Sequence, residues 1–245
     1  MEKVTTVGLD LAKNVFQVHG VDATGRVVLR RKLRRAEVLD FFAAMEPATI
    51  GMEACGGAHF WARELGRQGH EVRLMPPAYV RPYVKRGKTD AADAEAICEA
   101  VTRPSMRFVP AKTEAQQATA VELKTRELLV RQRTQAVNAL RAHLSEYGII
   151  AAQGAAKLAD LVAVVRDAED RRLPPMAREV LLELVEQVED LEGRIERLDR
   201  RMIRRVREDE TARRLATIPG IGAITAVALQ GLVPDVRGFR SARHF

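Results

Sequence analysis

The sequence predicts an α/β domain at the amino end, followed by an all-α region. Three observations indicate this arrangement. Short apolar or alternating runs, separated by turn residues, fill residues 1–110. Residues 114–147 contain neither glycine nor proline, and further along the chain apolar residues recur every three or four positions, as on one face of a helix. The length of 245 residues is enough for one or two domains with their own hydrophobic cores.

The first 110 residues are expected to form three antiparallel strands and then alternating helices and strands. Turn residues separate the first three runs by hairpin distances, which favours a meander. Helical spacing of apolar residues then alternates with two buried-strand patterns. A last helix is expected to begin near Asp90 and to end before Pro104. The expected strands are residues 4–12, 16–22, 26–34, 48–54 and 71–77, and the expected helices between them are residues 36–45 and 59–69.

The middle of the chain, residues 111–212, is expected to be helical. One long helix should end near Tyr147, before Gly148, and two consecutive prolines at 174 and 175 should break the next stretch. Beyond them a heptad pattern predicts pairing with another helix. That partner can belong to the same chain, as a helical hairpin, or to a second subunit, as a coiled-coil dimer. The pattern consists of Leu181, Leu184, Val188, Leu191, Ile195, Leu198 and Met202.

The composition restricts the class of protein. A net charge of +7 and a pI near 9.8 favour a polyanionic partner such as nucleic acid. No apolar run reaches the roughly 18 to 20 residues of a membrane span, and the amino end lacks the pattern of a signal peptide. The two cysteines do not have the spacing of a metal site, which fits a reducing compartment. We therefore expect a cytoplasmic protein with no membrane partner.

Four acidic residues are the candidates for catalysis and metal binding. Asp10 and Glu53 each end an apolar run, where a carboxylate is costly unless it is paired or coordinates an ion. Asp90 and Asp93 are three positions apart and share one face of the expected helix. A simpler explanation of this second pair is helix capping and a favourable place in the first turn. Together the four offer oxygen ligands for two Mg²⁺ or Mn²⁺ ions, the arrangement used in phosphodiester displacement.

A basic run directly precedes the second acidic pair. Its position suits the delivery of a phosphate backbone to metal ions, although a solvated loop would have the same composition. The run contains Arg81, Lys85, Arg86 and Lys88.

The acids stand in three phrases, GLDLAKNVF, GMEACGG and KTDAADA, and this ordered set resembles the DEDD transposases of bacterial insertion sequences. That family includes the Piv DNA invertase and the bridge-RNA-guided recombinases. The resemblance implies a RuvC-like, RNase H-like amino-terminal domain in which the four acids bind Mg²⁺. It also implies DNA and a guide RNA as partners, a homo-oligomer formed through the coiled coil, and strand cleavage and rejoining during DNA transposition.

A second pattern, independent of the acids, occupies the carboxyl-terminal region, residues 213–245. The stretch LATIPGIGAITAVAL fits a helix-hairpin-helix, in which glycines permit a tight turn and leave backbone N–H groups free to bind a DNA phosphate. A purely structural hairpin is the alternative, but arginines flank the pattern. The same element belongs to the second domain of the family. The candidate nucleic-acid-binding residues are Gly220, Gly222, Arg213 and Arg214.

The resemblance also implies a serine nucleophile, which in the family lies beyond the helix-hairpin-helix. Ser241 matches the segment before it, and the family's serine would follow Phe245. We therefore expect a carboxyl-terminally truncated product that binds Mg²⁺ and nucleic acid but recombines DNA weakly or not at all. Three alternatives stay open: a RuvC-like junction-resolving nuclease, a non-catalytic partner that inhibits an intact transposase, and an actin-like ATPase or sugar kinase, which needs a glycine-rich phosphate loop.

Overall fold

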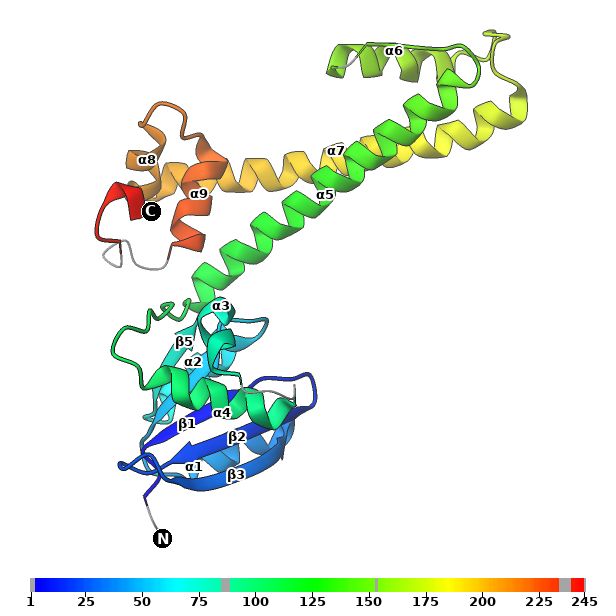
Figure 1. Ribbon diagram of the computed structural model, residues 1–245. Coiled ribbons are helices and arrows are strands. Elements are labelled where there is room, and N and C mark those ends of the chain that lie inside the picture. Colours follow the sequence, from blue (N-terminus) through cyan, green and yellow to red (C-terminus); the bar gives the residue numbers. More distant parts are fainter. Residues whose placement is uncertain (1–2, 85–88, 153, 234–238, 245) are drawn as a thin grey trace. The chain divides into compact units, whose positions relative to one another are not determined.

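A computed structural model describes residues 3–84, 89–152, 154–233 and 239–244 (Figure 1). The chain divides into two compact units. The first unit contains residues 1–114 and 234–245, and the second contains residues 115–233. Each hydrophobic cluster of the described residues lies within one unit, so each unit has a core of its own.

One mixed sheet of five strands forms the centre of the first unit (Figure 1). The strands are β1 (Thr6–Asp10), β2 (Val15–Val21), β3 (Val27–Arg34), β4 (Thr49–Glu53) and β5 (Glu71–Met75). Their order across the sheet is β3-β2-β1-β4-β5. β2 pairs antiparallel with β1 and with β3, which confirms the predicted meander. β4 is parallel to β1 and to β5, as expected for strands that are connected through helices.

Helices lie on both faces of this sheet. They are α1 (Val38–Ala43), α2 (Ala58–Arg67), α3 (Pro77–Val80) and α4 (Asp90–Val101), with 3₁₀ turns η1 (Arg35–Glu37) and η2 (Arg81–Tyr83). Successive side chains of a strand point to opposite faces. Val7 and Leu9 of β1 therefore pack into a core with Trp61 of α2, whereas Gly8 and Asp10 face α4. The side chain of Asp10, the last residue of β1, thus lies on the α4 side of the sheet.

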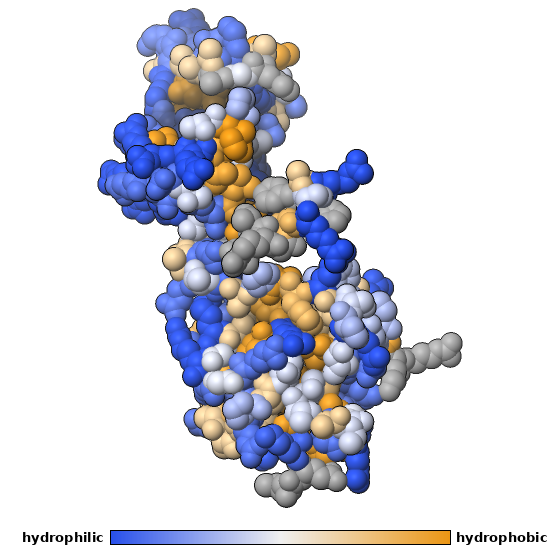
Figure 2. Space-filling model, turned by 90° about the vertical axis from the view of Figure 1, so that its left-hand side faces the viewer, coloured by the Kyte–Doolittle hydropathy of each residue, from blue (hydrophilic) through white to orange (hydrophobic). Residues whose placement is uncertain are grey.

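The described residues of the second unit are helical apart from connecting turns (Figure 1). The helices are α5 (Glu114–Ser145), α6 (Ala155–Arg166), α7 (Pro175–Glu208), α8 (Glu210–Ala216) and α9 (Ala223–Leu232). The two long helices are confirmed near the predicted bounds. Gly148 follows α5 at φ +69°, and Pro175 suits the first turn of α7 because no N–H partner is needed there. Figure 2 shows mainly hydrophilic surface on the helices of this unit, with limited hydrophobic patches.

The heptad residues of α7 face the inside of the second unit. Five of the seven are buried and the other two are half-buried. At one end Leu181 packs with Leu140 of α5, and at the other Met202 packs with residues of α8 and α9. Between them, Nη2 of Arg126 on α5 donates a hydrogen bond to Asp199 on α7 at 3.1 Å. Contacts within one chain therefore bury both ends of this row.

None of the helices that the structure describes has the length and apolar character needed to cross a bilayer.

Candidate metal centre

Two of the predicted acids end neighbouring parallel strands. Asp10 is the last residue of β1, and Glu53 is the last residue of β4. The strand register pairs Gly8 with Gly51. Since each acid stands two residues further along its strand, both lie at the same edge and on the same face of the sheet. The sequence contains this arrangement as a repeated glycine-x-acid pattern, GLD and GME.

The two glycines allow α4 to lie directly on the sheet. A Cβ atom on Gly8 would be 2.1 Å from the carbonyl oxygen of Ala94, and a Cβ on Gly51 would be 2.8 Å from Cβ of Val101. Any side chain at either position would push the helix away. With glycine in both places, the first turn of α4 comes beside the end of β1.

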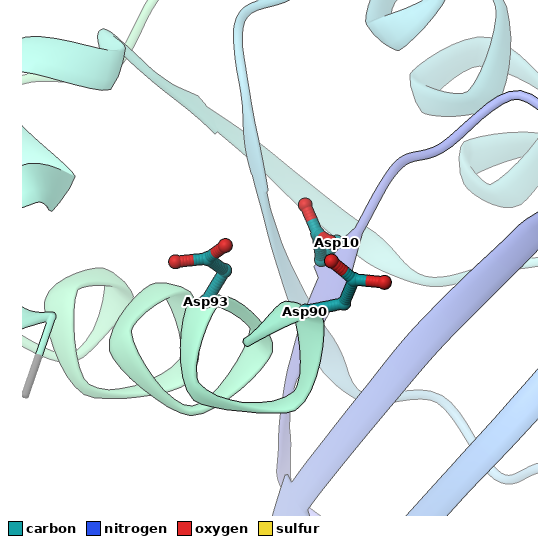
Figure 3. A group of neighbouring side chains, drawn as sticks. All are labelled: Asp10, Asp90 and Asp93. Carbon is teal, nitrogen blue, oxygen red and sulfur yellow. The ribbon is translucent and has the colours of Figure 1, made fainter. Parts of the chain in front are cut away.

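Asp10, Asp90 and Asp93 converge at this point (Figure 3). One carboxylate oxygen from each lies within 4.8 Å of the other two. Asp10 and Asp93 are half-buried, and Asp90 is exposed. The helix cap is Thr89, whose hydroxyl accepts a hydrogen bond from the Ala92 N–H at 3.3 Å. The capping role considered for Asp90 therefore falls to its neighbour.

Glu53 is outside the group of three acids, but its charge raises the pKa of Asp10 within that group. The pKa of the Asp10 carboxyl is raised to about 6, first by burial and then by the charges of Asp93, Asp90 and Glu53. Burial and the Asp93 charge also raise the pKa of Glu53. Burial and the nearby carboxylates raise the pKa of the Cys55 thiol, so the neutral thiol is favoured beside this site. Like charges held this close repel each other, and a bound cation would remove that cost.

The donor set fits a hard divalent cation. All of the converging ligand atoms are carboxylate oxygens, which Mg²⁺, Mn²⁺ and Ca²⁺ prefer to sulfur or nitrogen. Within the part of the chain that the structure describes, no lysine or arginine pairs with Asp10, Asp90 or Asp93. The described residues therefore leave the negative charge of this centre unneutralised.

The basic run predicted to deliver a phosphate backbone is only partly visible. Arg81 is exposed in η2. Lys85, Arg86 and Lys88 lie outside the described residues.

The predicted hairpin joins α8 and α9 in the second unit. Gly220 has φ +87°, a backbone conformation that favours glycine, and Gly222 directly precedes α9 with an extended backbone. Arg213 and Arg214 are exposed in the last turn of α8. The first N–H groups of α9 have no partner within their own helix, as at any helix start, and follow an exposed glycine.

Sequence reasoning missed three contributors to the metal centre. Gly8 and Gly51 provide the surface on which α4 rests, and Thr89 fixes where that helix begins. A signal was available for the glycines. Each stands inside a strand pattern, two residues before the acid, and a glycine in that position indicates that another backbone approaches closely.

The fold and the centre together define a class of protein: an α/β domain that gathers carboxylates at one edge of its sheet to hold a divalent cation. The DEDD transposase family of IS110 elements matches residues 7–149, and the transposase IS116/IS110/IS902 family matches residues 212–245. The chain therefore belongs to this family of insertion-sequence transposases, which confirms the resemblance drawn from the acidic phrases.

Curated relatives named as transposases align with 99% or more of this chain. A putative transposase of Sinorhizobium fredii is 46% identical over 245 residues, which cover 63% of that relative. A probable family 20 transposase of Pseudomonas aeruginosa is 49% identical over 243 residues, or 72% of its length. The transposase for insertion sequence element IS1328 of Yersinia enterocolitica is 42% identical, again over 72% of its length. The chain thus spans less than two thirds of the first relative and somewhat more of the others.

Proposed function

We propose that this protein acts in DNA transposition as a Mg²⁺-dependent transposase, and that residues 1–245 carry its metal centre. The observation that carries the proposal is the convergence of Asp10, Asp90 and Asp93 in a chain of this family. Glu53 is assigned as the fourth ligand because its charge couples to that of Asp10. Mg²⁺ is preferred to softer ions because the ligands are oxygens, and Mn²⁺ would substitute for it.

The family resemblance extends this proposal to the whole architecture. Residues 1–110 would form a RuvC-like, RNase H-like domain, residues 111–212 a coiled-coil region for assembly, and residues 213–245 part of a helix-hairpin-helix domain. Support comes from the meander followed by parallel strands, from the two long helices and from the glycine hairpin between α8 and α9. DNA as substrate, a guide RNA and a homo-oligomer are proposed from the resemblance, and the cytoplasm follows as the place where bacterial DNA is reached.

In this mechanism the carboxylates of the first unit bind the metal ions, and the helices of the second unit bind DNA. Asp10, Glu53, Asp90 and Asp93 would hold divalent ions, which when bound would supply Lewis-acid stabilisation of the charge that develops on phosphodiester oxygens. The backbone N–H groups after Gly220 and Gly222 would bind a phosphate, aided by the charges of Arg213 and Arg214. By resemblance the nucleophile is a serine whose hydroxyl oxygen bonds to the phosphorus, as a phosphoserine link, while the bond from phosphorus to the leaving oxygen of the DNA strand breaks.

Divalent-ion affinity is expected to fall by about tenfold per pH unit below about pH 6, because protons compete with the ion for Asp10. Calorimetric titration of the 245-residue chain with Mn²⁺, from about pH 5 to about pH 8, checks this. Equal affinity across that range would mean that the ion binds at a site without Asp10.

Activity is tested in a chimaera in which residues 1–245 replace the matching segment of the Pseudomonas relative. A plasmid recombination assay should detect products from this chimaera and a loss of at least about 100-fold in its Asp93→Asn variant, since even indirect ligand partners contribute 10- to 100-fold. Asp40→Asn, which changes an exposed acid on α1, is the matched control and should recombine normally.

Two results would contradict the proposal. The first is an Asp93→Asn chimaera that recombines as well as the unsubstituted one. The second is Mg²⁺-dependent cutting of a synthetic four-way junction by residues 1–245 alone, which would favour a junction-resolving nuclease.

A further inference from the structure

The edge strand β3 presents basic side chains on a part of the sheet that α4 does not cover. α4 packs on β1, β2 and β4 and leaves β3 open (Figure 1). Alternation along β3 places Arg30 and Lys32 on the α4 side, whereas Arg31 lies on the other side and stacks on the Phe41 ring at 5.8 Å. Both Arg30 and Lys32 are exposed, and within the described part of the chain neither forms an ion pair.

The strand register links these basic residues to the metal centre. Asp10 on β1 pairs with Gln17 on β2, and Gln17 pairs with Lys32 on β3. In the next row, His19 pairs with Arg30. Directly opposed residues point to the same face, and neighbouring strands are about 4.8 Å apart. The backbone of Lys32 is therefore about 10 Å from that of Asp10, on the same face.

A groove with a volume of about 420 Å³ lies between β3 and the start of α4. Arg30 and Lys32 line it on the β3 side, and Thr89 and Ala92, in the first turn of α4, line it on the other. Glu95 contributes an acid to the same lining. Gln17, which lines the groove, is directly opposed to Asp10, so the groove lies beside the metal centre.

Gln17 adds a polar side chain to the same groove. It lines the groove and is only 6% exposed. Its side-chain amide is not among the fully buried polar atoms that lack a partner, so it is accessible from the groove. An amide at this place can donate a hydrogen bond to an acceptor bound there.

We propose that this groove binds the phosphate backbone of the DNA strand that enters the metal centre. Arg30 and Lys32 make the ionic contacts, and the Gln17 amide donates a hydrogen bond to a phosphate oxygen. Contacts of this kind position a strand without reading its sequence. DNA is the occupant because the groove carries exposed basic residues beside the centre proposed to act on DNA, so this inference rests on the proposed function.

The test compares two double variants of the 245-residue chain. Arg30→Ala with Lys32→Ala removes the proposed contacts. Arg67→Ala with Arg73→Ala removes the same charge from residues of the same unit that pair with Glu64 and Glu71. Binding of fluorescein-labelled single-stranded DNA in Mg²⁺ is measured by anisotropy over a range of salt concentrations. The slope of log K against log salt should fall by about 1.4 in the first variant, for two lost phosphate contacts, and not in the control.

Gln17→Leu provides a charge-neutral check. It should weaken DNA binding by about tenfold without changing the salt slope, because it removes a hydrogen bond but no charge. Thermal melting confirms that each variant is folded.

Several outcomes would overturn the inference. They are equal salt slopes in the two double variants, undiminished binding by Gln17→Leu, or a loss confined to an RNA of the same sequence. Mn²⁺ titration separates this failure from that of the proposed function. If the chain binds no ion, the proposed function fails; if it binds the ion but DNA binding ignores Arg30 and Lys32, only the groove assignment fails.

Discussion

Asp10→Asn is expected to lower the affinity for Mn²⁺ by at least about 100-fold, since a direct ligand contributes more than the 10- to 100-fold of indirect partners. In the metal-free chain, the same change should raise the free energy of unfolding near neutral pH. The reason is that folding places this carboxylate in a half-buried site beside three other acids. An amide of the same shape carries no charge and avoids that repulsion.

The sign of the pH dependence follows from the pKa. The folded pKa of Asp10 is about 6, above the ordinary value of 3.8, so folding favours the protonated form. Its contribution to stability is fully present below the ordinary pKa and is lost as the pH rises through about 6. Allowing for partial solvent screening, we expect Asp10→Asn to be more stable than the unsubstituted chain by about 1 kcal/mol near pH 7.

The measurement is chemical denaturation of both chains without metal, at about pH 4 and about pH 7, with the difference vanishing at the lower pH. Asp22→Asn is the control, because hydrogen bonds from Thr24 and Arg26 lower the pKa of Asp22. It should have the opposite effect on stability and none on Mn²⁺ binding. Lower stability of Asp10→Asn at neutral pH would contradict this account of the acidic centre.

Gly8→Ala is expected to destabilise the first unit by about 3 kcal/mol and to weaken ion binding at the same time. The added Cβ would meet the Ala94 carbonyl oxygen and, at 2.4 Å, the Cys98 backbone nitrogen. Backbone atoms within a helix cannot rotate away as a flexible side chain can, so α4 has to shift. Overpacking usually costs 1 to 3 kcal/mol, and contact with backbone places this case at the upper end.

The control is Gly66→Ala, in α2, where an added Cβ has no neighbour within 4 Å. There alanine should be neutral or should stabilise the chain by about 0.5 kcal/mol through its higher helix propensity. Thermal unfolding and Mn²⁺ titration of both variants test the argument. A Gly8→Ala chain with unchanged stability and ion affinity would show that the contact between α4 and β1 is not what positions the acids.

Much of the first unit was predictable because its signals are local. Alternation and turn residues define the meander, and one apolar run after each helix defines β4 and β5. The identity of the acids was also predictable, since a carboxylate at the end of an apolar strand requires an explanation. The distance in space between the acids was not predictable, because the approach of Asp93 to Asp10 depends on how closely α4 packs on the sheet. That approach depends on packing between segments far apart in the sequence.

The second unit shows a different limit. The heptad row correctly predicted a long helix with one buried face, but the sequence pattern is the same whether the facing helix comes from one chain or two. The structure shows packing of α7 on α5, α6, α8 and α9 within the chain. α6 lies in the region expected to be helical, but no bounds were predicted for it, because a helix of twelve residues with weak amphipathicity has no clear periodic pattern.

The proposed ion site would also link folding to the free Mg²⁺ concentration in the cell. An ion that binds only the native state stabilises it by about 2.7 kcal/mol when its free concentration is 100 times the dissociation constant. A chelator would therefore lower the melting temperature of the first unit before any catalytic step is considered. In that sense magnesium would be a structural component of this domain as well as a participant in its chemistry.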